Sequence, residues 1–274
     1  MSDEHLTKLY SPSQWVPGRT GDEVIQEFYK STLEALKEVT DDESIVKNCD
    51  IPYGTGENQK VNVFGDVNEN LLILIHGGYW VSLDRNTILH PVRTAIDAGY
   101  GVASIGYGLA SKSYSLSRTV DDCVRGVRHV LAKFANAKTV VIAGHSAGAH
   151  LAFHAATRCR DRRIKGLALF AGVYTLDELV DTDIGKEANL TPDEAARNSC
   201  DFSALDGLET MRTKIFIGTN ECPKLVEQNR KLADARKEVE LEEIPDATHF
   251  TIISDLMKPG TRINTTFANF LRLF

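Results

Sequence analysis

The chain has 274 residues, of which 42% are hydrophobic and 25% are charged, and its formal net charge is −7 at pH 7. These fractions are typical of a soluble globular protein with enough apolar material for one large core, and the length fits a single α/β domain. The acidic balance, with an isoelectric point of about 5.6, argues against a nucleic-acid partner, because such proteins usually carry a basic patch.

The cysteines and the N-terminus indicate the compartment. An odd number of scattered cysteines without a CxxC pair predicts reduced thiols, with no disulfide framework and no zinc cluster. The opening residues MSDEHLTKLY are polar and acidic, so we expect no signal peptide, and no apolar run approaches the ~18 residues of a membrane span. We therefore predict a cytoplasmic protein without membrane contact. The cysteines are Cys49, Cys123, Cys159, Cys200 and Cys222.

Short apolar runs alternate with longer amphipathic stretches along the chain. Apolar residues at helical spacing predict a helix over 21–39, and the runs 45–52 and 60–64 resemble edge strands joined by a turn. Buried strands are then expected at 71–75, 100–107, 139–143, 166–172, 214–218 and 239–244. Further helices are expected at 86–98, 119–135, 147–159, 191–197 and 223–237.

This alternation of strands and helices predicts one α/β domain over residues 1–274, with a mostly parallel central sheet and helices on both faces. Residues 174–212 are less regular and rich in Asp, Glu and Asn. We interpret them as an insertion that forms part of a lid rather than as a second domain.

The pentapeptide Gly144-His145-Ser146-Ala147-Gly148 matches the pattern G-x-S-x-G. A β-branched run precedes it and a helical stretch follows, which is the strand–turn–helix setting of a nucleophilic serine in α/β-hydrolases. Glycines suit this turn because a β-carbon would clash where strand and helix pass closely. The pattern and its context predict an α/β-hydrolase fold with Ser146 as nucleophile, against the alternative of a plain glycine-rich turn.

A second motif, His76-Gly77-Gly78-Tyr79-Trp80, follows the first buried strand. In α/β-hydrolases a turn of this kind supplies backbone N–H groups to the oxyanion hole, which stabilises the negative oxygen of acyl-transfer intermediates. We expect Gly78 and Tyr79 to donate from this side and Ala147 from the start of the next helix. The alternative is a strand terminator followed by two buried aromatic side chains.

The general base should be a histidine downstream of the nucleophile, because the chain order in this fold is Ser, acid, His. Of the eight histidines, only His150, His154 and His249 follow Ser146. The first two lie on the helix directly after the nucleophile, where they cannot easily turn back to its hydroxyl. We therefore predict His249 as the base.

The acid should lie between Ser146 and His249, in a loop that follows a strand. Glu221 is the first carboxylate after the strand 214–218, and there it would orient the imidazole and stabilise the imidazolium. Four aspartates stay open as alternatives for the acid: Asp183, Asp201, Asp206 and Asp246.

Several segments together resemble the kynurenine formamidases (arylformamidases), a family of α/β-hydrolases in tryptophan degradation. They are Tyr10-Ser-Pro-Ser-Gln-Trp15, HGGYW at 76–80, GHSAGAH at 144–150, Leu190 to Ser199, Glu221-Cys-Pro, and His249-Phe250. The glycine-rich motifs also occur in other esterases, so the N-terminal and 190–199 segments carry the specificity. The chain departs from the family pattern at Cys200, Glu221 and Thr248, where proline, aspartate and aspartate are common.

The resemblance implies hydrolysis of N-formyl-L-kynurenine to L-kynurenine and formate, with no metal or organic cofactor. It implies that Ser146 becomes transiently formylated, with His249 moving the protons. A large aromatic leaving group implies an aromatic wall, for which Tyr79, Trp80 and Phe250 are the candidates, although Trp80 equally fits a core position. A homodimer is compatible with the resemblance, and the sequence does not decide it.

Two other functions compete with this prediction. A general carboxylesterase with a broad acyl range would need the same serine, histidine, acid and oxyanion turn. A non-catalytic binding protein on a hydrolase fold is the alternative from another class, and such proteins usually lose the serine or the histidine, whereas this chain keeps both.

Overall fold

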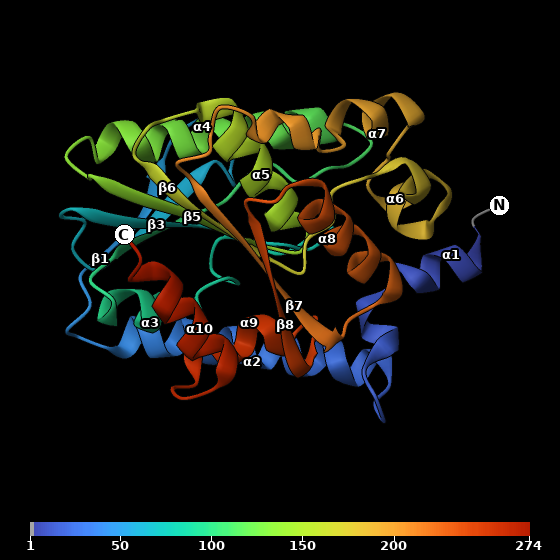
Figure 1. The fold of residues 1–274 in the computed structure, drawn as a ribbon, viewed down its shortest axis with the longest axis horizontal. Helices are drawn as coiled ribbons and strands as arrows, with labels where there is room; N and C mark the ends of the chain where they lie inside the picture. The colour runs from blue at the N-terminus through green and yellow to red at the C-terminus, as the bar shows by residue number, and fades with distance from the viewer. Residues whose placement is uncertain (1–2) are drawn as a thin grey trace.

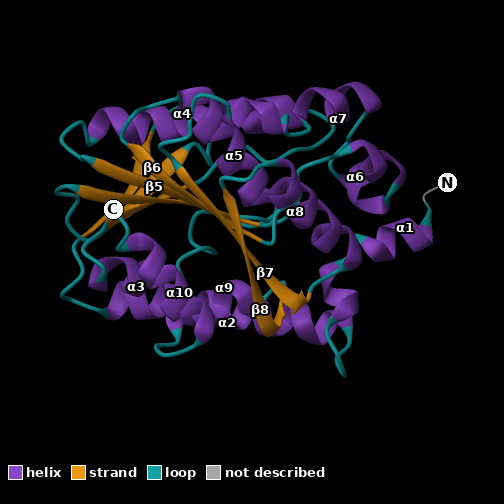
Figure 2. Cartoon of the chain, in the orientation of Figure 1, coloured by secondary structure: helices purple, strands orange, loops and turns teal. Residues whose placement is uncertain are grey.

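A computed structural model describes residues 3–274 of the chain. In this part, helices cover both faces of one eight-stranded sheet (Figure 1; Figure 2). The strands are β1 (Lys47–Pro52), β2 (Lys60–Phe64), β3 (Asn70–Ile75), β4 (Gly101–Ile105), β5 (Thr139–His145), β6 (Ile164–Phe170), β7 (Arg212–Asn220) and β8 (Val239–Thr248). The α/β architecture predicted from the sequence, a central sheet with helices on both faces, is thereby confirmed.

The strand order across the sheet is β1-β2-β4-β3-β5-β6-β7-β8. β2 is antiparallel to both β1 and β4, and every pairing from β4 to β8 is parallel. Neighbouring parallel strands end at the same edge of a sheet, and ligands bind at that carboxyl edge in open α/β folds. The residues that follow β3, β5, β7 and β8 are therefore brought to one side.

Two layers of helices bury the two faces of the sheet (Figure 1). One layer contains α4 (Leu116–Lys133), α5 (Ala147–Cys159), α7 (Pro192–Asn198) and α8 (Pro223–Ala235). The other contains α2 (Gly21–Asp41), α3 (Val92–Asp97), α9 (Thr251–Ser254) and α10 (Arg262–Leu271). Along β3 the side chains alternate between two apolar cores, with Leu71, Ile73 and Ile75 on the α5 side and Leu72 and Leu74 on the α2 side. This double burial explains why the strand reads as a continuous apolar run.

Two of the predicted helices differ from the structure, and the sequence predicted neither α9 nor α10. The helix expected at 86–98 is only Val92–Asp97, because Pro91 occupies its N-cap and Asn86 and Thr87 bond to Asp84 in a turn instead. In α2, the apolar residues at helical spacing are not all buried: Val24 and Phe28 are buried, but Ile25 and Leu33 are 41% and 66% exposed. They lie at the edge of the apolar face of α2, where helical spacing alone does not predict whether a side chain is buried.

Short helices make up the predicted insertion at 174–212, namely η2 (Asp177–Asp181), α6 (Asp183–Glu187), α7 and η3 (Phe202–Leu205). The N-terminal segment beside it contains α1 (Glu4–Leu9) and η1 (Pro12–Trp15), and a last turn, η4 (Asp255–Met257), precedes α10. The insertion contacts the N-terminal segment, since Asp3 N–H donates to the Asp181 carbonyl. Its function as a lid stays a prediction. No helix in residues 3–274 combines the length and the apolar character needed to cross a membrane.

Candidate active site

Ser146 stands on a strained turn between β5 and α5. Its backbone has φ 58° and ψ −123°, a conformation that non-glycine residues rarely adopt and that is typical of functional sites. Ser146 N–H donates to the Phe170 carbonyl at 2.8 Å, which fixes the turn against β6. The side chain therefore projects from the carboxyl edge of the sheet at the N-terminus of α5, where backbone N–H groups favour negative charge.

The two glycines of the motif are required by close packing. A β-carbon on Gly144 would lie 2.0 Å from the Gly148 carbonyl oxygen, and one on Gly148 would lie 2.1 Å from the Ile75 carbonyl oxygen. Strand β5, helix α5 and the end of β3 thus approach each other more closely than any side chain permits.

Glu221 and His249 are brought into contact by the ends of β7 and β8. Glu221 Oε2 lies 2.6 Å from His249 Nδ1, and both side chains are buried. The second carboxylate oxygen, Oε1, accepts a hydrogen bond from Cys222 N–H at 2.7 Å. A carboxylate on Nδ1 leaves the proton of the neutral ring on that atom and turns the lone pair of Nε2 outward, as a general base requires.

The four aspartates considered for the acid lie elsewhere. Asp246 is exposed, and its backbone bonds to Thr219 and Asn220. Asp201 caps η3, Asp206 pairs with Arg236, and Asp183 pairs with Lys186 at the start of α6. Among these candidates, the carboxylate that the structure places against His249 is that of Glu221.

Ser146 and His249 line the same pocket, which has a volume of about 280 Å³. In the described chain, no direct hydrogen bond joins Ser146 Oγ to the His249 ring, and such bonds often tighten only when substrate is bound. The pocket wall is mainly apolar, formed by Ile25, Phe28, Leu83, Ile184 and Phe250, with polar groups from Ser11, Ser13, Tyr29, Ser82 and His145.

Gly78 and Tyr79 of the HGGYW turn line this pocket, as Ser146 does. A β-carbon on Gly77 would lie 3.1 Å from Ser146 Cβ, and one on Gly78 would lie 2.4 Å from the Ser82 carbonyl oxygen. Gly78, Tyr79 and Trp80 have successive φ values of 91°, 44° and 66°. Left-handed backbone costs a non-glycine residue roughly 1–2 kcal/mol, so the surrounding contacts must hold this turn.

Of the aromatic residues predicted to contact substrate, Tyr79 and Phe250 line the pocket. Trp80 does not, because its side chain is fully buried and its indole N–H donates to His150 Nδ1 at 3.2 Å. Trp80 therefore occupies a core position, which was the alternative in the sequence analysis, and we do not retain Trp80 as a substrate contact.

Sequence reasoning missed two features of the site. His145, inside the nucleophile motif, donates from Nε2 to the His249 carbonyl at 2.8 Å, and burial lowers the pKa of His145 well below its usual value. Tyr79 donates its hydroxyl to the Tyr10 carbonyl at 2.6 Å, which ties the N-terminal segment to the turn. The family signature at Tyr10 to Trp15 could have indicated this second contact, because the sequence analysis gave these residues no structural role.

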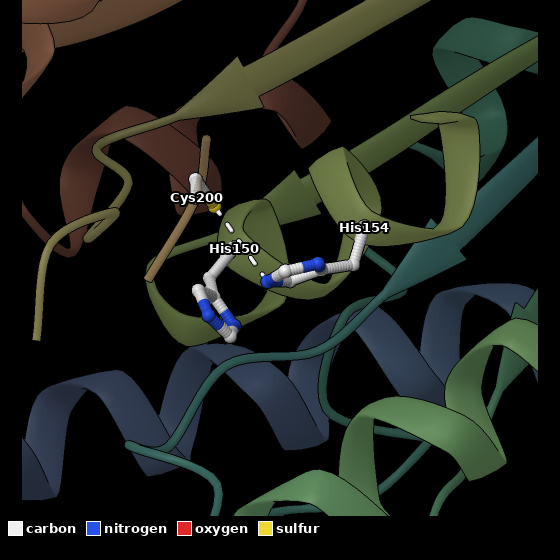
Figure 3. Close-up of side chains that lie close together, drawn as sticks. All are labelled: His150, His154 and Cys200. Atoms are coloured by element: carbon white, nitrogen blue, oxygen red, sulfur yellow. Dashed lines mark hydrogen bonds between the residues drawn. The ribbon is translucent and has the colours of Figure 1, made fainter. Parts of the chain in front are cut away.

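The sequence predicted no metal cluster, but the fold gathers His150 and His154 of α5 with Cys200, which follows α7 in the chain (Figure 3). One ligand atom from each lies within 4.8 Å of the others. These three residues are called the His–His–Cys cluster below.

Comparison with known proteins agrees with this architecture. Residues 72–253, well over half of the chain, match the α/β-hydrolase fold family, and the chain belongs to that family. Curated relatives named kynurenine formamidase occur in Salmo salar and Danio rerio. Each is 28% identical, over 94% of this chain and 92% of the relative. A relative with the same name in Drosophila melanogaster is 26% identical, over 77% of this chain and 75% of its own. The resemblance predicted from the sequence is confirmed.

Solved structures share the fold at lower identity. A protein from Silicibacter sp. TM1040 has a TM-score of 0.78 at 20% identity, covering 95% of this chain and 97% of that one. An esterase from Pyrobaculum calidifontis has a TM-score of 0.70 at 17% identity, covering 92% and 93%. At these identities the likeness describes the fold alone.

Proposed function

We propose that this chain is a serine hydrolase that cleaves the formamide of N-formyl-L-kynurenine, giving L-kynurenine and formate. The observation that carries the hydrolytic part is the Glu221–His249 contact beside Ser146 in one pocket. The choice of substrate is supported by the name of the relatives that match nearly the whole chain.

In the proposed reaction, Ser146 Oγ attacks the formyl carbon while His249 takes its proton. The oxyanion accepts hydrogen bonds from the N–H groups of Gly78, Tyr79 and Ala147, each donor contributing about 2.7–4 kcal/mol. His249 then protonates the departing aniline nitrogen as the C–N bond breaks. Water next attacks the formyl ester, His249 accepts its proton and returns it to Oγ, and formate leaves. Apart from the substrate and this water, the proposed steps use side chains and backbone groups of this chain.

The pocket composition supports an aromatic leaving group. Phe28 and Phe250 pack with ring centroids 5.3 Å apart, and Tyr79 completes an apolar wall beside the serine. Contacts between aromatic rings add about 0.5–1.5 kcal/mol beyond the area they bury. The compact volume suits the smallest acyl group, a formyl, on the other side of the scissile bond.

A broad-range carboxylesterase is the second candidate, and one observation favours it. Among residues 3–274, the side chains that line the pocket include no Asp, Glu, Lys or Arg that would pair with the amino-acid end of kynurenine. Neutral aryl and alkyl esters would fit the same wall.

The decisive experiment compares kcat/KM for N-formyl-L-kynurenine with that for short-chain nitrophenyl esters, in the wild type and in Ser146→Ala. We expect formate release from the formamide by the wild type and none above background from the variant. Ester hydrolysis without formamide cleavage would support the carboxylesterase function instead. If the folded wild type hydrolyses neither substrate and forms no fluorophosphonate adduct on Ser146, the result would support a non-catalytic binding protein.

A further inference from the structure

The residue types and spacing of the His–His–Cys cluster could hold a metal ion. The hydrogen bonds around the cluster indicate a structural role for His150 instead. The indole N–H of Trp80 is a donor only, so His150 Nδ1, 3.2 Å away, must accept. The proton of the neutral His150 ring therefore sits on Nε2, which donates to the Asn198 carbonyl at 2.6 Å.

That arrangement occupies both nitrogens of His150. For a metal to bind Nε2, the proton would have to move to Nδ1, where it would face the Trp80 N–H as a second donor. His154 Nε2 likewise donates to the Asn198 carbonyl, at 2.9 Å. Burial also raises the pKa of the Cys200 thiol well above its usual value, which disfavours the thiolate that a metal needs.

We propose instead that His150 is a positioning residue that fixes the two halves of the oxyanion hole relative to each other. One half is the Gly78–Tyr79 turn, and the other is the Ala147 N–H at the start of α5. His150 lies one helical turn after Ser146 on α5, and its bond to Trp80 connects that helix directly to the end of the turn. This inference rests on the proposed serine-hydrolase chemistry, not on the choice of formamide.

The turn needs such an anchor because its backbone is strained. Three consecutive residues, Gly78 to Trp80, have positive φ, and two of them are not glycine. The Trp80 side chain is fully buried, and the contact with His150 gives its one polar atom a partner. If this contact were lost, we expect the turn to relax and its N–H groups to move away from the position of the oxyanion.

The far side of His150 is also fixed. Asn198, which accepts its Nε2–H, is buried, and its side-chain amide donates to Ser117 Oγ at 3.0 Å and to the Glu194 carbonyl at 2.8 Å. The chain of bonds therefore runs from the oxyanion turn through α5 to the junction of α7 with α4. Burial lowers the pKa of His150 well below its usual value, so the ring stays neutral and keeps this pattern at physiological pH.

The test measures four single variants and the double variant His150→Phe/Trp80→Phe by hydrolysis of an ester, nitrophenyl acetate, and by fluorophosphonate labelling of Ser146. His150→Phe keeps a ring of similar size but neither hydrogen bond, and Trp80→Phe removes only the donor. His150→Gln restores one acceptor and one donor. His154→Phe is the matched control, since it loses a bond to Asn198 without touching Trp80.

We expect His150→Phe and Trp80→Phe each to lower kcat and the labelling rate about 10- to 100-fold, with KM changed less than threefold. His150→Gln should recover most of kcat, and His154→Phe should stay within about twofold of the wild type. The double variant should be no slower than the worse single variant, because both remove the same contact. The shape of the pH–rate profile should not change.

Three results would overturn the inference. The first is a normal kcat in folded Trp80→Phe. The second is an equal loss of kcat in His154→Phe, which would indicate general destabilisation. The third is stoichiometric Zn²⁺ binding by the dialysed wild type that Cys200→Ala abolishes, which would make the cluster a metal site. If the wild type cleaves the ester but not N-formylkynurenine, the proposed substrate fails while this comparison still holds.

Discussion

Glu221 holds His249 through one carboxylate oxygen, 2.6 Å from Nδ1, while its other oxygen accepts the Cys222 N–H at 2.7 Å. The acid is thus oriented by the backbone of the residue that follows it, where α8 begins. A carboxylate fixed at both oxygens has little freedom to rotate away from the imidazole.

This relationship predicts that Glu221→Gln lowers kcat/KM by about 10³- to 10⁴-fold, because an amide favours the wrong tautomer of His249. Asp246→Asn is the control and should remain within about twofold of the wild type, since Asp246 is exposed near the end of β8, three residues before His249. Steady-state kinetics on both variants decide the point. The reverse ranking would move the acid to Asp246.

The backbone of the oxyanion turn predicts a difference between two glycines that share a positive φ. Gly78 (φ 91°) has the Ser82 carbonyl oxygen 2.4 Å from the position of a β-carbon, whereas Gly99 (φ 84°) has open space around it. Gly78→Ala should therefore lower kcat at least about 100-fold, as the loss of an oxyanion donor would. Gly99→Ala should cost stability only, and a similar loss of kcat in both variants would contradict this account.

The Tyr79–Tyr10 contact predicts that Tyr79→Phe loosens the N-terminal segment, which supplies Ser11 and Ser13 to the pocket. We expect KM for aryl substrates to rise several-fold and the free energy of unfolding to fall by about 1–3 kcal/mol, because a buried carbonyl loses its donor. Tyr100→Phe removes a comparable bond, from Tyr100 to the Leu271 carbonyl at 2.8 Å, far from the serine. It should lower stability without changing KM, and a KM shift in both variants would refute the link.

The buried histidines predict how stability depends on pH. Burial lowers the pKa of His76 and His90 to about 4, and it also depresses the pKa of His145, His150 and His154. Unfolded imidazoles take up protons near pH 6.5, so below that pH the unfolded state binds more protons than the folded state. The free energy of unfolding should therefore be highest above pH 6.5 and fall toward pH 4. The slope is up to about 1.4 kcal/mol per pH unit for each such histidine.

Urea unfolding of the wild type and His90→Gln between pH 5 and 7.5 measures this effect. His90 is buried away from the serine, and its Nδ1 has no hydrogen-bond partner in the structure described. The variant should have a shallower dependence, by about one proton. Identical slopes would mean that His90 does not contribute to the loss of stability in acid.

The sequence by itself determined the fold class and the chain order of the residues proposed to react, Ser146, Glu221 and His249. Continuous apolar runs such as 71–75 indicate strands buried on both faces, and the glycines at 144 and 148 mark the turn that carries Ser146. These are local signals, because the period of a strand, the geometry of a tight turn and the chain order Ser, acid, His can all be read along the chain.

Only the tertiary structure decided which groups meet. Glu221 lies 28 positions from His249, Tyr10 lies 69 positions from Tyr79, and Trp80 lies 70 positions from His150. Trp80 illustrates the limit, since the family resemblance allowed either a substrate contact or a core position, and only the fold shows it buried against α5. A hydrogen bond between distant residues depends on strand order and helix packing, and no local pattern records either.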